Sequence, residues 1–89
     1  MLGVVVFAVL LLCLRFVSRI RQQRKILGET IRNYRKKAQM SQEDLAEKAD
    51  LHPVYMGKVE RGEQWVSLHA LLRVAHALGV RLRDLVADV

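Results

Sequence analysis

The chain has 89 residues, of which 52% are hydrophobic, and a formal net charge of +6. This length allows one small domain with a single core and leaves little room for a deep enzyme cleft. The single cysteine, Cys13, excludes an intramolecular disulfide, and one Pro with five Gly favours helices over a turn-rich β fold.

Residues 1–17 form an apolar segment in which Arg15 is the one charged side chain. As a helix the segment spans about 25 Å, just short of a hydrocarbon core of roughly 30 Å. We therefore divide the chain into an apolar N-terminal segment, residues 1–20, and a domain over residues 21–89. Three interpretations of residues 1–17 stay open: a membrane anchor, a translation start placed too early (with Val17 as a possible true start), and a helix that packs on a partner or a second copy.

Basic residues gather at the end of the apolar segment and beyond it. Residues 15–37, the basic belt, contain nine Lys or Arg against one acid, Glu29. Such a concentration of positive charge suits a polyanion, either nucleic-acid phosphate or anionic lipid headgroups. A solvated helix face is the alternative interpretation.

Apolar spacing and capping residues predict the next helices. The first covers about residues 22–38, where apolar side chains recur on one face: Leu27, Ile31, Tyr34 and Ala38. Ser41 is a good N-cap for a helix over about 42–49. Pro53 suits the first turn of a helix over about 53–61, and Gly62 suits its end.

Two further helices complete the predicted domain. Ser67 caps a helix that Gly79 ends, and its expected buried stripe consists of Leu68, Leu71, Leu72, Ala75 and Leu78. A short helix over about 81–88 is expected to offer its apolar side chains to the core: Leu82, Leu85, Val86 and Val89. The same side chains are also candidates for a dimer surface.

Residues 42–59 have the spacing of a helix-turn-helix unit. The apolar residues that would bury the seam between its two helices are Leu45, Ala49, Leu51, Met56 and Val59. Ala46 is small, as the close passage of the second helix requires. Asp50 stands where the turn prefers Gly, which is a mild departure because Asp tolerates the left-handed conformation.

Residues 24–87 resemble the λ-repressor-like, or Xre-type, DNA-binding domains of bacterial and phage regulators. The resemblance lies in "LGETIRNYR" (27–35), "SQEDLAEKA" (41–49), "VYMGKVERG" (54–62) and "SLHALLRVAHALGV" (67–80). It implies an all-α, five-helix λ repressor-like domain, here with an extra apolar N-terminal helix. It also implies a sequence-specific transcriptional regulator that binds double-stranded DNA as a homodimer, with no cofactor and no small-molecule ligand.

The same resemblance implies the binding residues. Gln42 would bond a phosphate and support the base contacts, and the helix over 53–61 would enter the major groove. Its reading face would consist of His52, Pro53, Val54, Gly57 and Lys58, with Tyr55 near the DNA backbone. Arg61 is placed for a phosphate. For His52 the alternative is a helix cap, and for Lys58 and Arg61 it is a solvated side chain.

Arg35 and Glu60 match the family's buried ion pair, which would lock the reading helix to the first helix of the domain. His69 and His76 share a helix face, but no Cys or carboxylate stands beside them at zinc-like spacing, so we expect no metal. No nucleophile motif or phosphate loop is present, and we expect no enzyme activity.

Two rival functions remain at this point: a membrane-tethered helix-turn-helix adaptor that binds protein, and the antitoxin of a toxin–antitoxin pair. The brevity of the chain after its last predicted helix resembles the controller proteins of restriction–modification systems. A cytoplasmic, nucleoid-associated protein is expected, with a possible tether to the inner membrane through its N-terminus.

Overall fold

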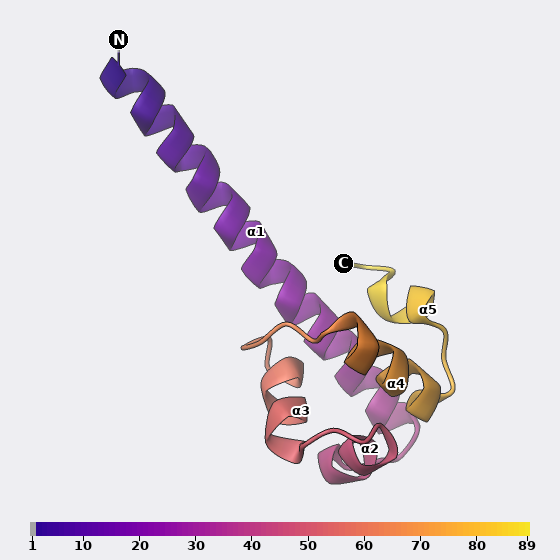
Figure 1. Cartoon of the computed structure of the whole chain (residues 1–89). Helices are drawn as coiled ribbons and strands as arrows, with labels where there is room; N and C mark the ends of the chain where they lie inside the picture. Colours follow the sequence, from indigo (N-terminus) through magenta and orange to yellow (C-terminus); the bar gives the residue numbers. More distant parts are fainter. Residues whose placement is uncertain (1) are drawn as a thin grey trace.

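The computed structural model describes residues 2–89, so Met1, the first residue of the apolar segment, lies outside the described residues. Across these residues the chain forms five helices and no strand: α1 (Leu2–Lys37), α2 (Gln42–Lys48), α3 (Pro53–Glu60), α4 (Leu68–Leu78) and α5 (Leu82–Val86). Figure 1 shows α2 to α5 gathered around the C-terminal half of α1, while the N-terminal half projects away from them. The predicted all-α fold is confirmed.

The apolar segment and the first helix of the domain are one continuous helix of 36 residues. The expected boundary between residues 20 and 21 therefore falls inside α1 rather than in a connection. The physical reason is local. Between Arg15 and Leu27 the chain contains neither Pro nor Gly, and its Arg, Gln and Lys residues favour helix.

The predicted caps are observed. Ser41 accepts a hydrogen bond from the Asp44 N–H, and the Asp44 carboxylate accepts one from the Ser41 N–H, a reciprocal capping box at the start of α2. The Ser67 hydroxyl accepts from the Ala70 N–H at 3.1 Å. Asp50 has a φ of 55°, the left-handed conformation expected for this turn. The helices α2 and α3 end one residue earlier than predicted, because their last expected residues act as C-caps.

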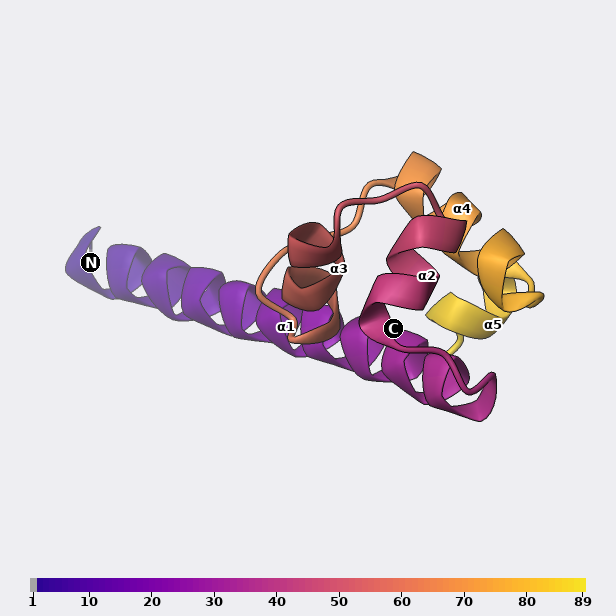
Figure 2. The same ribbon diagram turned by 90° about the horizontal axis from the view of Figure 1, so that it is seen from below.

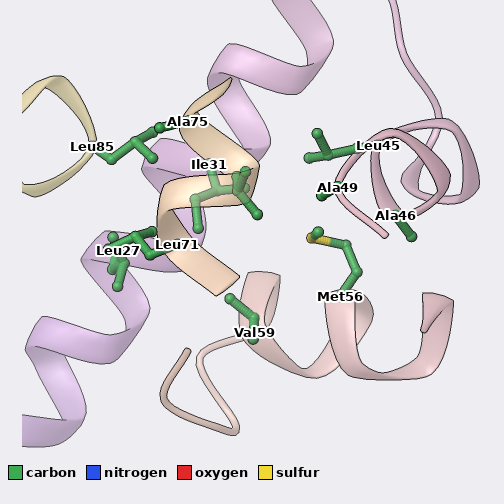
Figure 3. Close-up of a cluster of buried hydrophobic side chains, with 11 residues drawn as sticks. Leu27, Ile31, Leu45, Ala46, Ala49, Met56, Val59, Leu71, Ala75 and Leu85 are labelled. Carbon is green, nitrogen blue, oxygen red and sulfur yellow. The ribbon is translucent and has the colours of Figure 1, made fainter. Parts of the chain in front are cut away.

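The core lies where all five helices meet (Figure 3). Leu27 and Ile31 of α1 face the helix-turn-helix unit and α4, and Leu85 closes the core from α5. The predicted seam residues of α2 and α3 are buried, except for Leu51, which is half-buried. The core side chains are Leu27, Ile31, Leu45, Ala46, Ala49, Met56, Val59, Leu71, Val74, Ala75 and Leu85.

The predicted buried stripe of α4 is partly wrong. Leu68 and Leu72 are 64% and 49% exposed, and the buried residues of α4 are Ala70, Leu71, Val74 and Ala75. The predicted stripe was based mainly on the positions of the leucines. The helix instead turns its alanines inward, because small side chains let α4 approach the other helices closely.

Three other burial expectations also fail. Of the four apolar residues expected to face the core from the last helix, Leu85 is fully buried and Leu82 half-buried. Val86 and Val89 are exposed. The last helix is shorter than expected, five residues, and so presents one narrow face to α1 and α4. Ala38 lies past the end of α1 and is exposed.

The helices α1 and α3 cross (Figure 2), and Gly28 of α1 lies against the end of α3. A Cβ at Gly28 would lie 2.5 Å from the carbonyl oxygens of both Val59 and Glu60. No side chain fits at that separation. Gly28 is therefore the point at which the helix with the apolar segment touches the end of the predicted reading helix.

Candidate nucleic-acid interface

The helix α3 has one buried face and one exposed face. Met56 and Val59 are buried in the core, and Pro53 occupies the first turn, where no backbone N–H is needed. Four predicted site residues are exposed on its N-terminal half and outer side: His52, Pro53, Val54 and Lys58. The exposed side combines one lysine with methyl groups and an imidazole.

His52 is tied to the helix that it precedes. Its Nδ1 accepts a hydrogen bond from the Val54 N–H at 3.2 Å, so the imidazole acts as the N-cap of α3. The alternative role considered for this residue is therefore observed. No hydrogen bond joins the Nε2 atom to the described residues, so the ring retains one nitrogen for another partner.

Arg35 and Glu60 form an ion pair between α1 and the last residue of α3. Arg35 Nε lies 2.9 Å from Glu60 Oε2, and Arg35 Nη2 lies 2.9 Å from Oε1. Arg35 Nη1 also donates to the Met40 carbonyl at 2.9 Å. The Arg35 and Glu60 side chains are 10% and 1% exposed, so removing one partner would leave a buried charge, at a cost of about 3–5 kcal/mol.

Gln42 joins this buried pair to the start of α2. Its Nε2 donates to Glu60 Oε1 at 3.3 Å, and the residue is half-buried. The first residue of α2 is thus fixed relative to the last residue of α3. The Gln42 side chain is held at the junction of the two helices of the helix-turn-helix unit.

Gly57 does not lie open on the reading face as expected. It is buried, and a Cβ there would lie 3.0 Å from Arg61 Nη1 and 3.5 Å from Gln42 Oε1. The missing side chain makes room for the Arg61 guanidinium to fold back across α3. Gly57 therefore contributes space rather than a contact surface of its own.

Arg61 has a partner that the sequence reasoning missed. Its Nε lies 2.9 Å from Glu63 Oε1, and its Nη2 donates to Glu63 Oε2 at 3.2 Å. The hydrogen bond and charge of Glu63 raise the pKa of Arg61, and the hydrogen bond from Arg61 lowers the pKa of Glu63. Both side chains are more than half exposed, so the pair is open to competition from another anion.

Tyr55 is half-buried and links α3 to α4. Its hydroxyl oxygen accepts a hydrogen bond from the Ser67 N–H at 3.2 Å. The bond fixes the entry to α4 against the outer side of α3. Within residues 2–89 no group of three His, Cys, Asp or Glu side chains is arranged to hold a metal ion.

Comparison with known proteins gives concordant matches. The helix-turn-helix family model HTH_3 matches residues 31–85. The control protein C.BamHI of Bacillus amyloliquefaciens is 43% identical over 63 residues, which are 70% of this chain and 78% of that protein. The control protein C.SmaI of Serratia marcescens is 44% identical over 62 residues, 70% of this chain and 74% of that one.

Solved structures agree with the sequence matches. The crystal structure of the restriction-modification controller protein C.AhdI from Aeromonas hydrophila superposes with a TM-score of 0.69. It is 39% identical and covers 70% of this chain and 94% of its own. The clp gene regulator ClgR from Corynebacterium glutamicum superposes with a TM-score of 0.71 at 34% identity, over 73% of this chain and 69% of its own.

Proposed function

We propose a function from the premise that this chain belongs to the HTH_3 helix-turn-helix family. It is a DNA-binding transcriptional regulator, and the family is one of regulators rather than enzymes. The resemblance to λ-repressor-like domains is thereby confirmed, and the partner is DNA. We propose further which residues contact DNA, that the chain forms a homodimer, and that it contacts a membrane.

The recognition helix is α3, and it enters the major groove with its N-terminal half and outer side. The observation that carries this assignment is the pairing of an exposed face with a fixed scaffold. His52, Val54 and Lys58 are exposed, while Arg35 and Gln42 hold the other end of the helix through Glu60. A helix that is held at its last residue and packed along its buried face presents its exposed side chains in one orientation, which base reading requires.

Each exposed residue has a chemical role in this arrangement. Lys58 donates to a base edge or a phosphate, and Val54 and Pro53 offer apolar contact to a thymine methyl group. Gln42, Arg61 and Tyr55 lie around the ends of α3 and contact the phosphate backbone. Because the reading face has few hydrogen-bonding groups, we propose that DNA shape adds to sequence preference.

Lys58→Gln tests the recognition helix. Duplexes selected from a randomised pool by the full chain serve as probes, and affinity is measured by mobility shift at several salt concentrations. If Lys58 contacts a base, we expect the variant to lose about 1–3 kcal/mol of binding free energy. If it contacts a phosphate, we expect the slope of log affinity against log salt concentration to shrink by about 1. Lys48→Gln is the matched control, an exposed lysine at the far end of α2. Unchanged binding by the Lys58 variant would overturn the assignment.

The regulator acts as a homodimer on a two-fold symmetric operator, in the manner of a controller protein. What supports this is the similarity to control proteins C.BamHI and C.SmaI. Two-fold symmetric dimers are the commonest oligomers and match the symmetry of paired half-sites. Val86 and Val89 are exposed at the end of the chain and are available to a second copy, whereas Leu85 is not. Sedimentation of a Val86→Asp variant tests the interface, and an unchanged dimer would exclude α5.

A second candidate function concerns the apolar segment, which we propose tethers the regulator to a membrane. Three properties of α1 support it. The helix is long and apolar enough, by length and composition, to cross a bilayer. Its most apolar stretch is wholly exposed. No other described element packs on residues 2–17 to cover them. A bilayer removes that surface from water.

A further inference from the structure

The exposed apolar residues of α1 lie on every side of the helix. Leu10 and Leu12, for example, point about 200° apart around the axis and are 56% and 63% exposed. A helix that pairs with one protein partner carries a single apolar stripe and a polar opposite face. A helix that lies flat on a membrane has the same asymmetry. Residues 2–14 have neither stripe nor polar face, which fits surroundings that are apolar on all sides.

The basic residues that follow lie within a short length of the same helix. Arg15, Arg19 and Arg21 are exposed and span about 9 Å along the helix axis. The headgroup layer on one side of a bilayer is roughly 5–8 Å thick, so the three guanidinium groups match its depth. Arg15 and Arg19 share one side of the helix, about 40° apart, and Arg21 lies about 120° from Arg15 and 160° from Arg19. We call these three residues the collar.

The next contact along the helix belongs to the DNA-binding domain. Lys25 lies against Gly62, the residue after the α3 C-cap, and Leu27 is the first residue of α1 in the core. Lys25 and Leu27 stand about 12 and 15 Å beyond Val17 along the axis. The exposed collar therefore lies between the uncharged residues 2–14 and the first residues of α1 that contact the domain.

We infer that the collar binds the anionic headgroups of a phospholipid bilayer, which α1 enters roughly perpendicular to the membrane plane. This inference rests on the tether proposed above and adds its lipid chemistry and orientation. Acidic headgroups supply the counter-charge to three exposed arginines, and arginines on two sides of the axis suit a layer perpendicular to the helix. Because α1 is unbroken, the bilayer holds the recognition helix at a fixed distance from its surface.

The test is flotation of the full chain with vesicles after detergent removal. Vesicles of phosphatidylcholine alone are compared with vesicles that also contain phosphatidylserine. We expect binding to favour the anionic vesicles by roughly tenfold or more. The collar variant, with Arg15→Gln, Arg19→Gln and Arg21→Gln, is expected to lose this preference. A control that removes the same charge elsewhere, with Lys36→Gln, Lys37→Gln and Arg83→Gln, is expected to keep it.

Orientation is tested by Leu10→Lys and Leu12→Lys. A helix surrounded by lipid should lose flotation equally in both variants, whereas contact with one protein partner should affect one variant much more than the other. A one-sided effect would overturn the inference.

Flotation that does not depend on phosphatidylserine would overturn the collar while leaving the tether standing. No flotation with any vesicle would overturn both. DNA binding by the same preparations, measured by mobility shift, is a separate readout that neither leucine variant should change.

Discussion

At the scale of single residues, the Arg61–Glu63 pair bears on the DNA contact that we propose for Arg61. The two side chains share two hydrogen bonds, and their proximity lowers the pKa of Glu63, which therefore stays ionised throughout the neutral range. A phosphate must compete with this carboxylate for the guanidinium. In the proposed complex, Glu63 would also place a negative charge near the DNA backbone and repel it.

Glu63→Gln should therefore strengthen DNA binding. We expect roughly two- to fivefold tighter binding at low salt, with the gain shrinking as salt screens the charges. Fluorescence anisotropy with a selected duplex measures it. Glu47→Gln is the control, because it removes an exposed acid from α2 without freeing an arginine. Equal gains in both variants would mean that net charge, and not Arg61, is responsible.

Side-chain contacts could be predicted where a motif fixes the spacing of the residues. They could not be predicted where a turn brings two neighbouring residues together. Arg35, Glu60 and Gln42 stand at set places in the pattern of the resembled family, and the structure brings them into one network. The Arg61–Glu63 pair depends on the left-handed turn at Gly62, which has a φ of 72°. Residues two apart do not face each other on a helix, so spacing alone does not indicate this contact.

At the scale of elements, the crossing of α1 and α3 depends on Gly28. We expect Gly28→Ala to destabilise the domain by about 1–3 kcal/mol, because the new Cβ would overlap two backbone carbonyl oxygens that cannot move independently. Urea unfolding followed by circular dichroism measures the loss. Gly3→Ala is the matched control: nothing lies within 4 Å of its added Cβ, so the better helix propensity of Ala should be neutral or favourable. Equal stability of the two variants would contradict the close crossing.

The capping box of α2 makes a prediction about acid stability. Hydrogen bonds from the Ser41 backbone and side chain lower the pKa of Asp44 below its ordinary value of 3.8. A carboxylate whose pKa is lower in the folded state stabilises the fold above its unfolded pKa. That contribution is lost as the pH falls below about 4 and through the folded pKa.

Asp44→Asn should therefore lower stability at pH 7 and have little further effect at pH 2–3. Thermal unfolding of the variant and the parent chain at both pH values measures the difference. Asp88→Asn is the control, because Asp88 is an exposed acid that follows the last helix. A constant difference between variant and parent at both pH values would show that the Asp44 charge does not act through the cap.

The boundaries of α2, α3 and α4 could be predicted from local chemistry, to within one residue, whereas the buried face of α4 could not. Ser41, Pro53, Ser67 and Gly79 each act within one turn of the chain, so the residues alone indicate where helices begin and end. The inward face of α4 depends on which helices surround it. Leu68 and Leu72 look like core residues by type, but α4 packs against α2 and α5 with Ala70, Leu71, Val74 and Ala75 buried.

At the scale of the whole molecule, the chain combines a rod with a compact domain, and its extents are 57 × 24 × 20 Å. A compact chain of this length has a radius of gyration near 12 Å, and the value here is 16.4 Å. The excess comes from the projecting half of α1 (Figure 1). The continuous helix across residues 15–27 was the feature hardest to predict from the sequence. The composition changes there from apolar to basic, which suggested a domain boundary, but α1 runs through it without a break.

The two halves of α1 should differ in local stability although they share one hydrogen-bonded helix. Residues 27–35 place Leu27, Ile31 and Arg35 in the core, so opening there disrupts the domain. Residues 2–17 have no tertiary contacts, and an exposed helix of that length is marginal in water. Hydrogen exchange in mild detergent-free buffer at low protein concentration should therefore be on the order of a hundredfold faster in the first half. The second half of the same helix is the internal control. Equal protection in both halves would mean that another copy of the chain covers residues 2–17. A membrane would then not be needed to cover their apolar surface.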